Sequence, residues 1–159
     1  MKETIRRWAT GCFRFIRSTT GHVPPEQVFR HLHFTGPFSV TLPGGSRLTL
    51  YSWGNRVENE LAWLGWDGHE ATERRRWASM VATGGDVLDV GANTATYALT
   101  AKALSPASRV HAIEPLARIA AMARQNAATA SLDVHVACLA FAANSRFTIL
   151  AGRTHRAPP

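Results

Sequence analysis

The chain has 159 residues, of which 45% are hydrophobic, so that one globular domain with a core is expected. Its formal net charge is +7, but the basic residues are spread along the chain and favour no specific nucleic-acid site. Cys12 and Cys138 show neither disulfide nor zinc spacing, and no apolar run resembles a membrane span or a signal peptide, so we expect a cytoplasmic protein without a metal.

Residues 2–17 are predicted to form a basic amphipathic helix. Two interpretations of this helix stay open: an arm that docks on its own domain or on a partner, and a weak contact with an anionic membrane surface. The apolar residues at helical spacing are Ile5, Trp8, Ala9, Cys12, Phe13 and Ile16.

Residues 28–53 alternate apolar and polar positions on both sides of Pro43-Gly44-Gly45, which predicts a β-hairpin. Residues 55–82 have a helical pattern in two pieces, broken at 65–68. We interpret Arg56, Glu58 and Glu60 as a charged helix start, and residues 74–76, three consecutive arginines, as a solvated helix face. Residues 1–84 are thus expected to form an N-terminal helical and hairpin extension.

Strand and helix patterns alternate from residue 86. Strands are predicted at 87–90, 110–113 and 134–139, with helices between them that end near 104 and 126, and residues 147–150 form a further candidate strand. Such a βαβαβ order predicts a parallel sheet in an α/β, Rossmann-like domain over residues 85–150. Residues 151–159 are polar and proline-terminated, and are expected to be a disordered tail.

The turn after the first of these strands is the strongest functional signal. It places Asp89, Gly91, Ala92 and Asn93 at the carboxyl end of a buried parallel strand, where α/β sheets bind ligands. Glu114 ends the next strand, 114 − 91 = 23 residues after Gly91, close to the spacing at which an acidic side chain meets a ribose. These five residues are our predicted cofactor site.

The sequence of the turn distinguishes between cofactors. It lacks the G-x-G-x-x-G pattern of a dinucleotide fold, and Asp89 would repel a diphosphate, which disfavours a nicotinamide-dependent oxidoreductase. A cofactor with an ammonium and a sulfonium group suits the carboxylate, and S-adenosylmethionine (SAM) has both. The alternative interpretation of Asp89 is the polar end of a buried strand.

Residues 89–93, Asp-Val-Gly-Ala-Asn, together with Glu114-Pro115, resemble the FkbM-type methyltransferases, and the resemblance extends over roughly residues 30–140, Asn126 included. It implies a class I methyltransferase fold and O-methylation by direct displacement, with Asp89, Gly91 and Asn93 at the methionine end of SAM and Glu114 at the ribose. Two departures are Ala95, where the family has a glycine, and Phe141, where an acidic residue would lie near the adenine.

The same resemblance implies an Asp-x-Glu-Gly segment downstream of residue 150, which this sequence lacks. We therefore expect an N-terminal fragment, with catalytic residues and the methyl acceptor, a small molecule or a glycan, unassigned. The alternative is an inactive truncated product that acts as a cofactor-binding or interaction module. Without a neighbour on one side, the strand at 87–90 would form an exposed sheet edge through which the chain self-associates.

Overall fold

A computed structural model of the chain describes the backbone of residues 2–139 and the side chains of residues 8–139. The chain divides into two compact units, Met1–Arg76 and Trp77–Pro159. The predictions for Phe141, for a strand at 147–150 and for a tail at 151–159 lie outside the described residues. No helix within residues 2–139 is both long and apolar enough to cross a bilayer.

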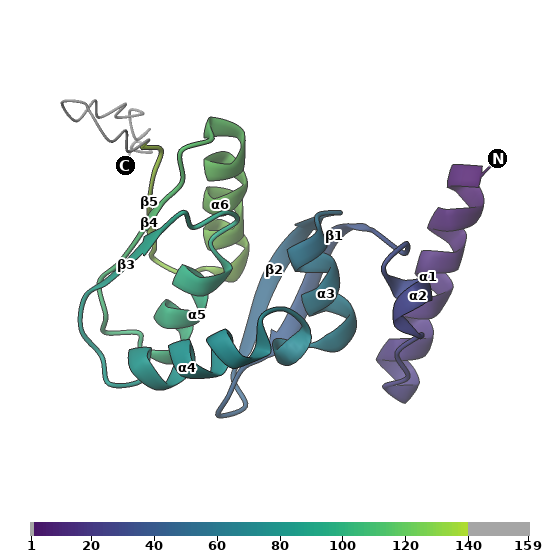
Figure 1. Ribbon diagram of the computed structural model, residues 1–159, viewed down its shortest axis with the longest axis horizontal. Coiled ribbons are helices and arrows are strands. Elements are labelled where there is room, and N and C mark those ends of the chain that lie inside the picture. The colour runs from purple at the N-terminus through teal and green to yellow at the C-terminus, as the bar shows by residue number, and fades with distance from the viewer. Residues whose placement is uncertain (1, 140–159) are drawn as a thin grey trace, which may run out of the picture. The chain divides into compact units, whose positions relative to one another are not determined.

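The N-terminal unit combines helices with one β-hairpin (Figure 1). As predicted, the hairpin strands are antiparallel, and the helical region that follows is interrupted near residue 65. The first helix runs three residues past the predicted end at 17. The elements are α1 (Lys2–Thr20), α2 (Glu26–Phe29), β1 (Thr35–Thr41), β2 (Arg47–Trp53), α3 (Arg56–Leu64), the short 3-10 helix η1 (Trp66–Gly68) and α4 (Ala71–Val81), which continues into the second unit.

Helix α3 is the centre of this unit. It packs on both strands of the hairpin, whose inward residues include Leu48 and Leu50. Its own Trp63 is buried against Phe29 and Leu32, and Phe13 of α1 packs on the same cluster. The indole Nε1 of Trp63 donates to the Leu32 carbonyl oxygen at 3.2 Å, so its polar atom is satisfied inside the core.

Two charged side chains of this unit, Glu58 and Arg74, are buried. Helix α3 begins at Arg56 with Glu58 in its first turn, in line with the predicted charged helix start, whereas the prediction of a solvated arginine face is corrected at Arg74. Glu58 lies three residues before Leu61, so both occupy the face of α3 that meets the core, and no described group bonds its carboxylate oxygens. Arg74 is buried, donates from Nε to the His69 carbonyl oxygen at 2.9 Å and places its guanidinium over the Trp66 ring. Sequence pattern alone does not distinguish such positions from solvated ones.

The C-terminal unit is the predicted α/β arrangement. Strands β3 (Val87–Val90), β4 (Val110–Ile113) and β5 (His135–Ala137) form a parallel sheet in the order β3-β4-β5. Helix α5 (Thr96–Leu104) packs on β3 and β4, and α6 (Ala117–Ala130) packs on β5 and α5 (Figure 1). Strand β5 is shorter than predicted, and α6 is longer, because its alanine-rich sequence continues to Ser131, which ends the helix in a left-handed conformation.

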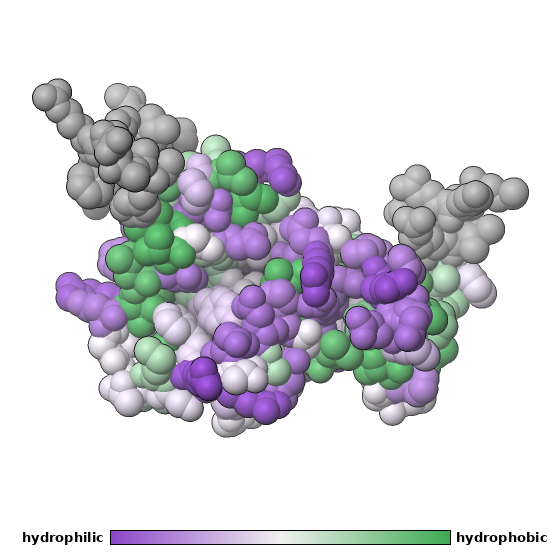
Figure 2. All heavy atoms as spheres, in the orientation of Figure 1, coloured by the Kyte–Doolittle hydropathy of each residue, from purple (hydrophilic) through white to green (hydrophobic). Residues whose placement is uncertain are grey.

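The face of the sheet that carries Leu88 and Val90 is open in this unit. Their exposed fractions are 60% and 59%, and Figure 2 shows hydrophobic surface over this part of the molecule. The His111 and His135 rings, 5.4 Å apart, lie in register with Leu88 on the same face. Within residues 2–139, β3 pairs with β4 alone, so its second edge bears unpaired backbone groups.

Candidate cofactor site

The loop between β3 and α5 is sharply curved. Gly91, Asn93 and Ala95 have positive φ values of 80°, 50° and 64°, a conformation that is unfavourable for the two residues with side chains. The backbone N–H groups of Gly91 and Ala92 both donate to the Ile113 carbonyl oxygen at 2.9 Å. These bonds fix the loop over the carboxyl end of β4.

Side chains along this loop alternate between solvent and core. Gly91 and Asn93 are exposed, whereas Ala92 and Thr94 are buried. A Cβ built at Gly91 would meet no atom within 4 Å, so there is open space where a ligand would approach the backbone. Of the predicted site residues in the loop, Ala92 directs its methyl group inward and has its N–H bonded within the protein. A ligand would therefore meet the loop at Gly91 and Asn93.

Ala95, the residue that departs from the FkbM-type pattern, has an exposed fraction of 0%. Its methyl group lies in the core and does not line the open side of the loop. Behind the loop, Nδ2 of the buried Asn126 in α6 donates to the Thr94 carbonyl oxygen at 2.9 Å. The loop is thus anchored from a helix more than thirty residues later in the chain.

Glu114 lies directly after β4 and is only 6% exposed. Its Oε2 accepts the N–H of Asn93 at 3.0 Å, and its Oε1 accepts the N–H of Leu116 at 2.9 Å. One carboxylate therefore joins the loop after β3 to the turn after β4. Because each carboxylate oxygen has a second lone pair, Glu114 retains the capacity to accept ligand hydroxyls.

Asp89, in β3, is partly buried and points toward the start of α5. Its Oδ2 accepts the N–H of Ala98 at 3.1 Å, which caps a helix whose own N-cap residue, Ala95, has no side-chain acceptor. No described cation forms an ion pair with Asp89. Burial raises the pKa of its carboxyl group, and the hydrogen bond from Ala98 opposes this rise.

The structure therefore brings the predicted residues together at the carboxyl ends of β3 and β4, where Gly91 N–H and Asn93 N–H are held by groups of the neighbouring strand. Sequence reasoning missed two supports of this site: the capping bond of Asp89 and the anchoring bond of Asn126. The sequence offered no signal for the first, since Asn93, Thr94 and Thr96 near the helix start are themselves residue types that cap helices; for the second, the polar Asn126 within an alanine-rich helix was the available signal.

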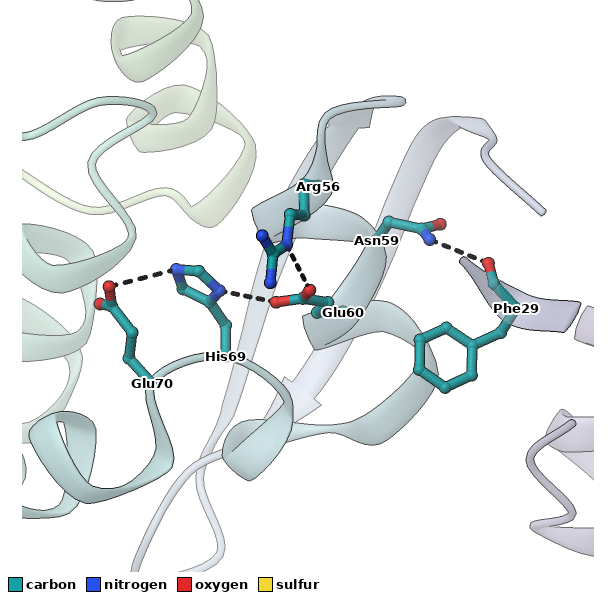
Figure 3. Close-up of polar contacts among 6 residues, drawn as sticks. All are labelled: Phe29, Arg56, Asn59, Glu60, His69 and Glu70. Carbon is teal, nitrogen blue, oxygen red and sulfur yellow. Dashed lines mark hydrogen bonds and ion pairs between the residues drawn. The ribbon is translucent and has the colours of Figure 1, made fainter. Parts of the chain in front are cut away.

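A second polar cluster lies in the N-terminal unit (Figure 3). Glu60 accepts one hydrogen bond from Arg56 Nε at 2.6 Å and contacts His69 Nδ1 at 2.7 Å, and these groups line a cavity of about 720 Å³. Burial acts to raise the pKa of Glu60, but the bonds from Arg56 and His69 outweigh it and hold the pKa below its usual value. Among the described side chains no three metal-binding residues gather as a metal site requires.

In comparisons with known proteins, no family pattern matches the chain, and none of the curated proteins matches it significantly. Among solved structures, a SAM-dependent methyltransferase from Agrobacterium tumefaciens is 15% identical, with a TM-score of 0.46 over 67% of this chain and 33% of that protein. A protein-L-isoaspartate O-methyltransferase is 13% identical, with a TM-score of 0.38 over 81% of this chain and 41% of that protein. The chain spans less than half the length of both, and similarity at this level assigns no activity.

Proposed function

We propose that the chain binds SAM at the loop after β3 and belongs to an O-methyltransferase of the FkbM type. The observation that carries the proposal is the environment of Asp89. This carboxylate lies at the ligand-binding end of the sheet, is partly desolvated, and has one backbone hydrogen bond but no cationic partner among the described residues. A cationic ligand would stabilise the negative charge of this carboxylate.

The chemistry of Asp89 favours SAM over a dinucleotide. An ammonium or sulfonium near the carboxylate would stabilise its charged form, whereas a diphosphate would add like charge in a partly buried place. The open backbone at Gly91 suits the close approach of the methionine end. Because the Ala95 methyl group lies inside the core, it does not obstruct that approach.

Glu114 would accept hydrogen bonds from the ribose hydroxyls. Each of its carboxylate oxygens accepts one backbone N–H and has a second lone pair for this purpose. When bound, SAM supplies an electrophilic methyl group on its sulfonium. The residues of this chain would contribute orientation of that cofactor and exclusion of water from it. The acceptor, a small molecule or a glycan, and the residues that contact it are not assigned, and the cytoplasmic location is part of the proposal.

Calorimetric titration of the chain with SAM, its demethylated product and NAD tests the proposal. We expect binding of the first two and none of NAD; preferential binding of NAD would contradict it. Glu114→Gln should weaken SAM about tenfold or more, as expected for a bond to a charged group. Asp133→Asn, which removes an exposed acidic residue of the same unit, is the matched control.

Adenosine, which lacks the methionine end, separates the two carboxylates. Asp89→Asn keeps an acceptor for the Ala98 N–H but removes the charge, so it should weaken SAM and leave adenosine unchanged. Glu114→Gln should weaken both ligands. Equal losses of both ligands in the Asp89 variant would show that Asp89 acts only by holding α5.

A second candidate function, an interaction module without catalysis, is favoured by the open edge and open face of β3. In this alternative, a second copy of the chain pairs with Val87–Val90. Sedimentation velocity over a range of concentrations tests it, because self-association would appear as a concentration-dependent sedimentation coefficient. A monomer at every concentration would argue against it.

A further inference from the structure

A small cavity of about 160 Å³ in the N-terminal unit is distinct from the proposed SAM site. It lies where α1, the start of the hairpin and α3 meet. Its lining includes three aromatic side chains, and the polar side-chain groups are two guanidiniums and two hydroxyls. We call it the guanidinium pocket, and it is lined by Arg14, Arg17, Ser18, Phe34, Phe38, Ser39, Ala62 and Trp63.

Both arginines of the guanidinium pocket are bound by neutral groups. Arg14 donates from Nη2 to the Pro37 carbonyl oxygen at 3.2 Å and places Cζ 3.9 Å from the centre of the Phe34 ring. Arg17 donates from Nε to the Trp63 carbonyl oxygen at 2.9 Å. These contacts hold the two guanidiniums in place. Most of the guanidinium N–H groups form no hydrogen bond that the structure describes.

No acidic side chain within residues 8–139 forms an ion pair with Arg14 or Arg17. The sequence places ten of its eleven acidic residues in that range, and Glu3 is the exception. Burial lowers the pKa of both guanidiniums, and the charge of Arg14 lowers that of Arg17 further. Two like charges are thus held together and partly desolvated, an arrangement that an anion would stabilise.

The shape and polarity of the guanidinium pocket indicate which kind of anion would bind there. Planar guanidinium forks match phosphate oxygens in a bidentate manner, and two of them balance the two charges of a phosphomonoester. The Ser39 hydroxyl, 3.1 Å from that of Thr49, provides a neutral hydrogen-bonding group at the wall. The half-buried Phe38 offers apolar surface to a small organic substituent, and the small size of the cavity favours a small ligand.

We propose that the guanidinium pocket binds the phosphate group of a small phosphomonoester through Arg14 and Arg17. This site is independent of SAM binding and is used whether or not the chain is a methyltransferase. A phosphomonoester occurs both on soluble metabolites and on the headgroup of phosphatidic acid. Because the exposed residues Trp8 and Phe15 of α1 are apolar, the membrane source is tested alongside the soluble one.

The test is calorimetric titration of the full chain with phenyl phosphate at constant ionic strength, with benzoate as the matched monoanionic carboxylate. We expect phenyl phosphate to bind more tightly than benzoate. Arg14→Gln and Arg17→Gln should each weaken it about tenfold or more, whereas Arg47→Gln, the same charge change at an exposed position of β2, should leave it unchanged. Arg17→Lys, which keeps the charge but removes the fork, should give an intermediate loss.

Circular dichroism establishes that each variant is folded before titration, and Arg17→Lys is the milder variant if a glutamine disrupts α1. Failure of phenyl phosphate to bind more tightly than benzoate, or equal binding by the wild type and all folded pocket variants, would overturn the proposal. Co-sedimentation with phosphatidylcholine vesicles, with and without phosphatidic acid, forms the second arm. Vesicle binding that depends on phosphatidic acid and is lost in the same variants supports the pocket and identifies the lipid source.

If vesicle binding survives both arginine substitutions and phenyl phosphate does not bind, the membrane contact belongs to the apolar surface of α1 and the proposal is wrong. SAM titration of the same variants separates this result from the proposed function. Since Arg14 and Arg17 lie in the N-terminal unit, loss of phosphate binding with unchanged SAM affinity is the expected pattern.

Discussion

Glu114→Gln is the substitution whose effect on the fold follows most directly from the structure. The carboxylate is buried and accepts two backbone N–H groups, from Asn93 and from Leu116. A glutamine side chain of nearly the same shape has one carbonyl acceptor, and its amide would face the second N–H as a donor. The variant therefore loses at least one bond without creating a cavity.

The magnitude follows from the charge of the acceptor. A hydrogen bond to a charged group contributes about 1.5–3 kcal/mol, and little of this is screened because Glu114 is only 6% exposed. We expect Glu114→Gln to lower the free energy of unfolding by about that amount. Glu114→Ala should cost more, because neither N–H retains a side-chain acceptor and the side-chain volume is also lost.

Urea unfolding followed by circular dichroism measures this change, and Asp133→Asn controls for the loss of one negative charge. Hydrogen exchange should localise the effect to the amides of Asn93 and Leu116. A Glu114→Gln variant within about 0.5 kcal/mol of the wild type, the range of an ordinary surface substitution, would show that the two bonds do not hold the loop. The interpretation of Glu114 as a support of the site would then have to be withdrawn.

Three further outcomes are expected. Burial raises the folded-state pKa of Asp89, so its contribution to stability is present below its unfolded pKa of about 3.9 and is lost as pH rises through the raised folded value. In urea unfolding between pH 3 and pH 7, the free energy of unfolding of Asp89→Asn should therefore rise relative to that of the wild type. A fall relative to the wild type would contradict the burial argument. Val90→Lys should reduce self-association in sedimentation velocity and leave stability within about 0.5 kcal/mol, because Val90 is largely exposed at a sheet edge. Asn126→Ala should cost about 1–3 kcal/mol in urea unfolding, since it leaves the Thr94 carbonyl without this donor; an unchanged midpoint would show that the anchor is dispensable.

Most of the elements were predictable because each is encoded locally, but the short helix α2 (Glu26–Phe29) was missed, and the hairpin begins at Thr35 and not near residue 28. The hairpin follows from alternation around Gly44 and Gly45, and β3 and β4 follow from short apolar runs that end in turn residues. The burial of Glu58 and Arg74 was not predictable, because it depends on which helix face meets the core and on acceptors such as the His69 carbonyl. The end of α6 was missed because helix-forming alanines extend it past Asn126.

The positions of the candidate residues in the fold were predictable, but their hydrogen bonds were not. Spacing indicated that Asp89 and Glu114 would end neighbouring strands, and the structure places them there. Their bonds to Ala98 and Asn93 depend on the three-dimensional path of the loop, which no spacing encodes. The guanidinium pocket could not be predicted from the sequence for the same reason, since it combines residues of α1 with residues of the hairpin and of α3.

The two carboxylates of the candidate site stabilise the fold, and in the proposed function they would also contact the cofactor. Asp89 caps α5, and Glu114 joins the loop to the turn after β4. A site built in this way is preorganised, because the groups that would meet the ligand are already fixed by backbone bonds. Loss of SAM binding in a variant is therefore insufficient evidence of contact: only the comparison of SAM with adenosine, in a charge-removing variant that keeps the capping bond, separates a role toward the cofactor from a role in the loop.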